Sequence, residues 1–253
     1  MDVMANYDRC LEYINSQAQV LRRPASGDAN AARWRAVTIS RQAGAGSHVV
    51  AEALIDRLRT SAPGGSRPWT IFDRNLVERV LEDHDLPARL ARFMPEDRVS
   101  EMADTMDELF RVHPSSWTLV RKTADTILHL AELGNVVVIG RGANIITKKL
   151  DYVFHVRLVG SLAKRIEHIR DYRQLGLEAA TEYVRDEDLG RGRYVKKYYA
   201  ADIEDPLLYH LVINTDLVSY GEAGRMIADA VRSEEPGAAH VSVRSGSLAS
   251  STG

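Results

Sequence analysis

Short runs of β-branched and aromatic residues alternate with helical patterns along the middle of the chain. The runs predict five β-strands, at residues 35–40, 69–72, 135–140, 152–158 and 210–214. Apolar residues that recur every three or four positions predict helices over residues 47–58 and 115–133, and again after Ser161. Strands that alternate with helices are typical of a mostly parallel sheet covered on both faces. The chain is therefore predicted to have an α/β fold.

The segments on either side of this region have other patterns. Apolar residues between Met4 and Leu21 form one stripe of a helix, which we expect to dock on the main domain; pairing with a second copy in a homodimer is the alternative. Residues 22–32 are small, polar and rich in helix breakers, and the residues after Val231 predict a disordered tail. We expect an N-terminal helix and linker (1–34), one α/β domain (35–232) and a tail (233–253).

The composition excludes several classes of protein. Apolar residues make up 45% of the 253 residues and the formal net charge is −2, so no overall basic field favours nucleic acid or a membrane as a partner. The sequence has no apolar stretch of the roughly 18 residues that a membrane-spanning helix needs, and its start is unlike a signal peptide. Cys10 is the single cysteine, which excludes an internal disulfide. We expect a cytoplasmic protein whose partners are small molecules.

The segment between the first predicted strand and the next helix is rich in glycine. It has the sequence ISRQAGAGSH over residues 39–48. Glycines allow the backbone to curl so that successive N–H groups point inward, and the N-terminus of the helix adds partial positive charge. This arrangement suits phosphate. The predicted phosphate-binding residues are Gly44, Ala45, Gly46, Ser47 and His48.

The loop departs from the Walker A pattern, G-x-x-x-x-G-K-[ST]. Alignment on Gly46 places Arg41 at the first glycine, Ser47 at the lysine and His48 at the serine or threonine. The lysine that contacts the terminal phosphates is therefore absent. Arg41 is a candidate replacement, since a guanidinium binds phosphate with a different reach and geometry. The alternative is a glycine turn that joins strand to helix without a ligand.

Three further segments follow in a characteristic order. They are VVVIGRGAN at residues 136–144, DEDLGRGRYVKKYY at 186–199 and DPLLY at 205–209. Together with the glycine loop they make residues 35–232 resemble the cytidylate-kinase-like family, relatives of bacterial cytidylate kinase among the nucleoside-monophosphate kinases. The resemblance implies a P-loop kinase core with strand order 2-3-1-4-5, an acceptor-binding helical insert at residues 76–114 and a mobile lid at about 177–205. It also implies transfer of the γ-phosphoryl group of ATP to CMP or dCMP, with Mg²⁺.

The resemblance also assigns residues. Arg141 matches the arginine of a Gly-Arg-Asp motif that holds the acceptor monophosphate, but Gly142 replaces the aspartate, which puts recognition of cytosine in question. Asp73 and Asn144 are the other expected acceptor-binding residues. The expected lid arginines are Arg185, Arg191 and Arg193. The catalytic candidates are Arg41, Arg141 and Arg191, because phosphoryl transfer depends on positioning and on neutralising charge.

Simpler explanations exist for several of these residues. The lid arginines have acidic neighbours at helical spacing and can pair with them, for only about 0.3–0.5 kcal/mol each. Asp73 can cap a helix, and His48 can be an inert residue at a helix start. The acidic residues of the insert match no metal-binding spacing, so no metal site made by protein side chains is expected.

Three functions remain open from the sequence. The first is an active kinase for a pyrimidine monophosphate or a related small acceptor. The second is a nucleotide-binding regulatory module with little turnover, because one strong transition-state contact is worth on the order of 3–4 kcal/mol and the lysine is missing. The third is a structural protein with an empty glycine loop.

Overall fold

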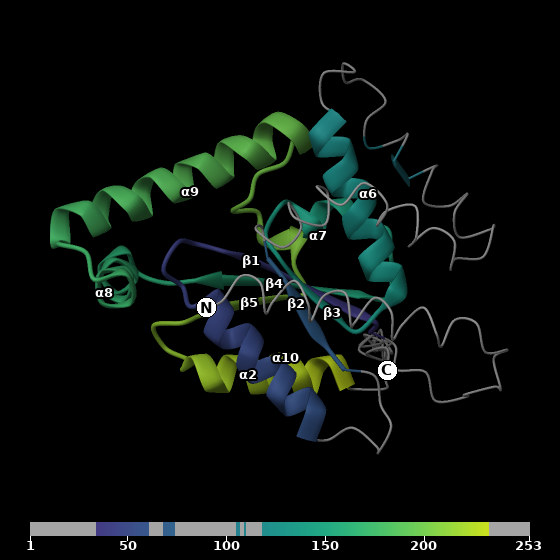
Figure 1. Ribbon diagram of the computed structural model, residues 1–253, viewed down its shortest axis with the longest axis horizontal. Coiled ribbons are helices and arrows are strands. Elements are labelled where there is room, and N and C mark those ends of the chain that lie inside the picture. Colours follow the sequence, from purple (N-terminus) through teal and green to yellow (C-terminus); the bar gives the residue numbers. More distant parts are fainter. Residues whose placement is uncertain (1–33, 61–67, 74–104, 107–108, 110–117, 233–253) are drawn as a thin grey trace, which may run out of the picture.

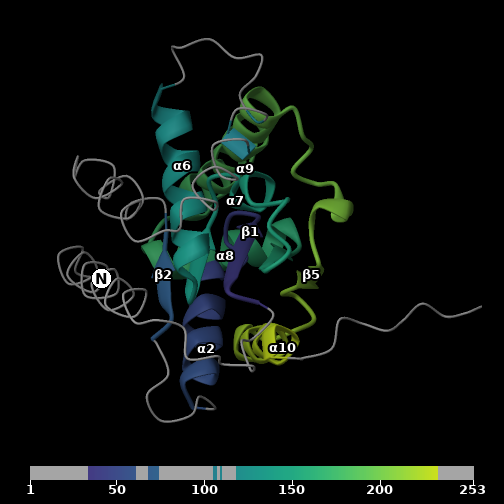
Figure 2. The ribbon, with the colours of Figure 1, turned by 90° about the vertical axis from the view of Figure 1, so that its right-hand side faces the viewer.

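The computed structural model describes residues 34–60, 68–73, 105–106, 109 and 118–232. Its core is a parallel five-stranded sheet in the order β2-β3-β1-β4-β5, which confirms the expected fold class and strand order. The strands are β1 (Ala36–Arg41), β2 (Thr70–Phe72), β3 (Val136–Ile139), β4 (Val153–Val159) and β5 (Leu211–Asn214). Figure 2 shows β2 and β5 on opposite sides of β1, as this order requires.

The central strands are apolar on both sides because helices cover both faces of the sheet. Val37 and Ile39 of β1 pack toward one face, whereas Ala36 packs toward the other. All four residues of β3 are buried. Alternating side chains of a strand point to opposite faces, so a strand covered on both sides has a continuous apolar run.

Among the described helices, two cover the first face and two the second. Helices α2 (Ser47–Thr60) and α10 (Tyr220–Arg232) pack side by side on the face of Val37, below the sheet in Figure 1. Helices α6 (Thr118–Leu133) and α7 (Ala143–Ile146) cover the other face. Helix α6 ends as expected at Gly134, whose φ of 80° suits glycine in a helix C-terminal cap.

The remaining helices connect β4 to β5 and extend along the carboxyl edge of the sheet. Helix α8 (Leu162–Arg173) begins after Ser161, whose side chain accepts a hydrogen bond from the N–H of Lys164 as an N-cap. The long helix α9 (Leu177–Tyr199) then runs back over the sheet (Figure 1). A short 3₁₀ turn, η2 (Pro206–Leu208), leads into β5.

Some expectations concern other residues. The N-terminal helix and the tail lie outside the described residues, and so does nearly all of the insert at 76–114. Within the described part of the chain, the helices are too short or too polar to cross a membrane.

Candidate functional site

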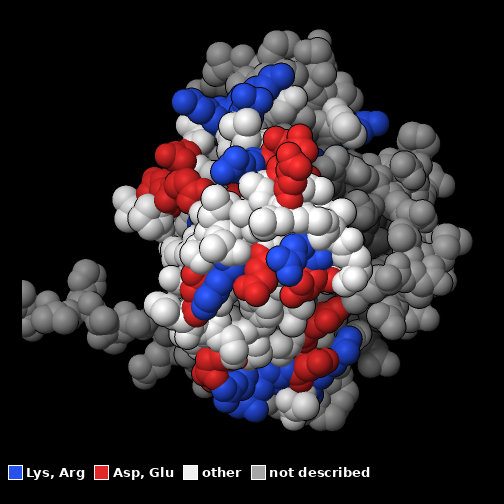
Figure 3. Space-filling view, turned by 90° about the vertical axis from the view of Figure 1, so that its left-hand side faces the viewer, with Lys and Arg blue, Asp and Glu red and all other residues white. Residues whose placement is uncertain are grey.

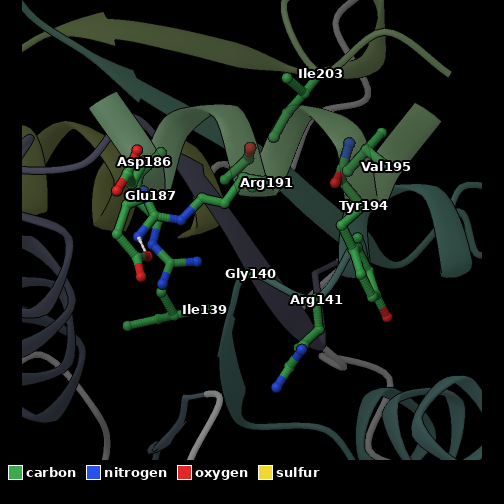
Figure 4. Close-up of a pocket in the computed structure, with 14 residues that line it drawn as sticks. Ile139, Gly140, Arg141, Asp186, Glu187, Arg191, Tyr194, Val195 and Ile203 are labelled. Carbon is green, nitrogen blue, oxygen red and sulfur yellow. Dashed lines mark hydrogen bonds and ion pairs between the residues drawn. The ribbon is translucent and has the colours of Figure 1, made fainter. Parts of the chain in front are cut away.

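The candidate site lies where the carboxyl ends of β1 and β3 meet α9. A cavity of about 320 Å³ opens there between the last residues of the two strands, the turn after β3 and the middle of α9. Figure 4 shows Arg191 and Glu187 on the helix, with Gly140 and Arg141 on the strand side. Ligands of open parallel sheets bind at this edge.

Arg41 is the last residue of β1 and lines the cavity. Its guanidinium lies against the main chain of Gly140, in the space that a Cβ at position 140 would occupy. Burial, and second the positive charge of Arg191, lower the pKa of Arg41 to about 10. The side chain is therefore still protonated at neutral pH, and it has already lost most of its hydration. Binding of a phosphate in the cavity would therefore cost little additional free energy for desolvation of Arg41.

The turn after β3 holds Arg141 in a backbone conformation that is uncommon for residues with a side chain. Gly140, Arg141 and Gly142 have φ angles of 85°, 56° and 70°. Two tyrosines of α9 cover the turn. The hydroxyl of Tyr199 donates to the carbonyl of Arg141 at 3.4 Å, and the Tyr194 ring centroid lies 5.9 Å from Cζ of Arg141. Such backbone conformations cluster at functional sites.

Packing accounts for the glycine at position 142. A Cβ there would lie 2.5 Å from Cε2 of Tyr199, which is itself packed against the cluster between α6 and the sheet. Aspartate does not fit while Tyr199 keeps its place. In this chain, therefore, no carboxylate at position 142 is available to recognise a base.

Asn144 lies on α7, one turn after Arg141. It is 6% exposed and lines the cavity, and its Nδ2 has no hydrogen-bond partner among the described residues. Buried amide groups nearly always have a partner. Asn144 is therefore a donor available to a ligand in the cavity.

The lid arginines separate into two groups. Arg191 lines the cavity and donates to Glu187 Oε2 at 2.6 Å and to Asp188 Oδ1 at 3.5 Å. Arg185 and Arg193 are exposed on α9 and do not line it. The structure thus brings one lid arginine together with Arg41, and that arginine also makes the ion pairs along the helix that its acidic neighbours suggest.

The glycine loop is held closely on its outer side. A Cβ at Gly44 would lie against the main-chain carbonyl of Arg165 in α8, and one at Gly46 against the ring of Tyr220 in α10. Among the described residues, the N–H groups of Gly44, Gly46, Ser47 and His48 have no acceptor. Two of them belong to the first turn of the 14-residue helix α2. Such a group of donors at a helix N-terminus binds anions well.

His48 and Asp73 come together beside this loop. Nε2 of His48 lies 3.9 Å from Oδ2 of Asp73, at the end of β2. Burial lowers the pKa of His48, and the charge of Arg41 lowers it too, although Asp73 acts in the opposite direction. The imidazole is therefore neutral at neutral pH.

From the sequence, Asp188 is only an acidic neighbour of the lid arginines, and Arg165 is not singled out at all. The N–H of Ala43, in the glycine loop, donates to Asp188 Oδ1 at 2.6 Å, and Nη1 of Arg165 donates to Asp188 Oδ2 at 2.6 Å. Arg165 also donates to the carbonyl of Ala43 at 3.0 Å. No local pattern signals these contacts, because they join positions far apart in the chain.

Sequence reasoning also missed Arg157 on β4. Arg157 is 2% exposed, donates from Nη1 to Ser40 Oγ at 2.9 Å and forms an ion pair with Glu204. The hydroxyl of Tyr209 lies 3.2 Å from the same Ser40 Oγ and donates to the carbonyl of Ile203 at 2.8 Å. A signal existed: an arginine in the middle of an apolar strand run must be buried and paired.

A second cavity of about 260 Å³ adjoins the glycine loop at Gly44. Gly44, Lys164, His168, Asp216 and Tyr220 are among its lining residues. The Tyr220 hydroxyl lies 3.2 Å from Nδ1 of His168. The segment from β1 to α2 thus lines two cavities, one at Arg41 and the other at Gly44.

The chain belongs to the cytidylate kinase-like family. The model of that family matches residues 36–217, which include the glycine loop, the turn at Arg141 and α9. This confirms the family resemblance. No curated protein matches the chain in sequence.

The solved structures that are similar to the chain include one from Eubacterium ventriosum and one from Thermus thermophilus. An uncharacterized protein from Eubacterium ventriosum is 18% identical, with a TM-score of 0.53 over 79% of this chain and 99% of its own. TT1252 from Thermus thermophilus is 14% identical, with a TM-score of 0.37 over 78% of this chain and 96% of its own. The first shows that the fold is shared.

Proposed function

We propose that the protein transfers the γ-phosphoryl group of ATP to a nucleoside monophosphate of the CMP or dCMP type. The observation that carries the proposal is the meeting of Arg41 and Arg191 in one cavity beside a loop with four unpartnered N–H groups. Positive charge on both sides of a transferring phosphoryl group is what this reaction requires. The family supports use of nucleotides in general.

The donor nucleotide would lie on the glycine loop. The free N–H groups of Gly44, Gly46, Ser47 and His48 would bind its phosphates. The second cavity adjoins the loop at Gly44 and offers the ring of Tyr220 as a surface for the base. Arg41 would supply the charge that a Walker A lysine supplies elsewhere.

The acceptor would lie in the first cavity. Arg141 would bind its phosphate, and the orphan Nδ2 of Asn144 would donate to another of its oxygens. Asp186 and Glu187 of α9 line the same cavity and would accept from hydroxyl or amino groups. Because Gly142 brings no carboxylate, the base must be recognised by other groups.

Mg²⁺ would enter with the nucleotide and neutralise phosphate charge. Among the described residues, no group of three His, Cys, Asp or Glu side chains is placed to hold a metal ion. The carboxylate of Asp73, beside the start of α2, has the oxygen ligands that Mg²⁺ prefers. One carboxylate with substrate phosphates is a common arrangement for this ion.

Two observations favour a second function. Ser47 stands at the lysine position, and the guanidinium of Arg41 is fixed against Gly140 at the cavity. A protein that binds ATP without transferring its phosphoryl group would have the same features. Nucleotide-dependent regulation is therefore the alternative.

The expected partners are nucleotides. Acidic and basic side chains are interspersed on the face at the α8 end of the molecule (Figure 3), which is unlike the continuous basic surface of a nucleic-acid-binding protein. A cytoplasmic location, a lid at about 177–205 and a homodimer through the N-terminal helix remain predictions.

The deciding experiment measures ADP release with ATP, Mg²⁺ and a panel of nucleoside monophosphates. Turnover that depends on one monophosphate and is lost in Arg141→Ala supports the kinase. The control is Arg59→Ala, at an exposed position of α2 outside the proposed lid, which should keep full activity. Bound ATP without turnover for any monophosphate supports the regulatory function instead.

A further inference from the structure

Asp188 connects the glycine loop to the acidic and basic residues of α9. Its Oδ1 accepts from the N–H of Ala43 at 2.6 Å and lies 3.5 Å from Nη1 of Arg191. Its Oδ2 accepts from Arg165 at 2.6 Å. One carboxylate thus contacts the loop, α8 and the arginine that reaches the first cavity.

In this contact the negatively charged carboxylate of Asp188 occupies one hydrogen-bond donor of the glycine loop, the N–H of Ala43. Ala43 directly precedes Gly44, the first of the residues with a free N–H. A phosphate bound at those N–H groups would be close to the Asp188 carboxylate, and like charges at short range repel. It would also attract Arg165 and Arg191, the two cations that now pair with Asp188.

The helix around Asp188 has room to adjust. Gly190 and Gly192 follow within one turn, and a Cβ at either would contact nothing within 4 Å. Packing therefore does not require glycine at these positions, and each weakens a helix by about 1 kcal/mol relative to alanine. Tyr194 and Tyr199 anchor the helix to the turn at Arg141 beyond them.

We propose that Asp188 is an inhibitory latch between the glycine loop and α9, which a bound nucleotide opens. In the latched state Asp188 holds Ala43 and, together with Glu187, pairs with Arg191. When phosphate occupies the loop, Asp188 withdraws from Ala43, and Arg191 is released toward the ligand in the first cavity. Nucleotide binding would therefore raise the affinity for the acceptor, and the reverse effect must be equal. The inference rests on the proposed function and adds its regulation.

The test is calorimetry with a non-hydrolysable ATP analogue and Mg²⁺, on wild type, Asp188→Asn and the control Glu182→Gln. Glu182 is exposed on the same helix, so the control makes the same change of charge away from the loop. Asp188→Asn should bind the analogue about fivefold more tightly or better, at the low end of typical coupling factors. Glu182→Gln should bind it as wild type does. An unchanged or weaker affinity in Asp188→Asn overturns the latch, because a purely structural contact would only lose affinity.

A second measurement addresses coupling. CMP affinity should rise when the analogue saturates wild type, and the rise should disappear in Asp188→Asn and in Asp188→Ala, which removes the acceptor oxygen altogether. Thermal melting of each variant tests whether it is folded. If the analogue raises CMP affinity equally in wild type and in the variants, the latch is wrong, but the proposed function is not affected. Absence of analogue binding in wild type contradicts both the latch and the proposed function.

Discussion

Arg157 on β4 and Ser40 on β1 share a buried hydrogen bond, 2.9 Å long, at the wall of the first cavity. Arg157 is 2% exposed, and it forms an ion pair with Glu204 in the segment after α9. The charge that supports this wall of the cavity is thus balanced by a residue at the end of the proposed lid.

Glu204→Gln should destabilise the fold by about 1 kcal/mol, because the buried Arg157 would lose its ionic partner, while the exposure of Glu204 screens the pair. Urea unfolding measures the effect. The control is Glu222→Gln, which removes an exposed pair with Arg225 on α10 and should change stability by less than about 0.5 kcal/mol. Equal effects of the two changes would contradict the role given to Glu204.

Arg41→Ala should weaken ATP binding about tenfold or more, equivalent to about 1.4 kcal/mol, because the loop has no lysine to replace the guanidinium. Arg41→Lys should recover part of the affinity. Titration of the fluorescence of a labelled ATP gives the dissociation constants. Arg59→Ala, at an exposed position of α2, is the control. Unchanged affinity in Arg41→Ala would remove Arg41 from the donor site.

Gly142→Asp should destabilise the fold by about 2–4 kcal/mol, although it restores the family motif, because of left-handed strain and overpacking against Tyr199. Adding Tyr199→Ala should remove the overpacking part, so that the double variant is more stable than the sum of the two changes predicts. Gly221→Asp, where a Cβ meets nothing within 4 Å, should have little effect. Strict additivity would show that Tyr199 does not exclude the aspartate.

Stability should fall as the pH is lowered from about 6.5 to about 4. Burial, and second the charge of His210, lower the pKa of His155 from 6.5 to about 4 in the fold, where its Nδ1 lies 2.8 Å from Thr38 Oγ1. Between these values the unfolded chain binds the proton and the folded chain does not, so protonation favours unfolding. Urea midpoints measured from pH 4 to pH 8 test this. His155→Gln should flatten the dependence, and an unchanged slope would assign it to other groups.

The elements of the fold were predictable because their signals are local. The run VVVI predicts β3, and Gly134 and Ser161 mark a helix end and a helix start. Strand order depends on contacts between distant segments, and only the family resemblance supplied it. The same division holds for the site. The glycine loop and Arg141 lie in recognisable segments, whereas the contact of Ala43 with Asp188 spans 145 positions.

Helical geometry explains the outcome for the lid arginines. With 3.6 residues per turn, Asp188, Arg191 and Val195 share one side of α9, whereas Arg193 lies nearly opposite Arg191. The sequence therefore contained the information that one arginine of the group faces the sheet. The sequence did not show which side of α9 faces the sheet, because glycines and charged residues interrupt the apolar pattern of this helix.

Because Arg41 contacts Gly140, the residue at one of these two positions on neighbouring strands restricts which residue the other can have. Even the methyl group of alanine at position 140 would displace the guanidinium from its place beside the main chain. A relative that has a side chain at position 140 is therefore expected to lack the arginine at position 41 or to hold its guanidinium in another place. Across relatives of this chain, the two residues should be kept together or lost together, whatever acceptor each relative has come to use.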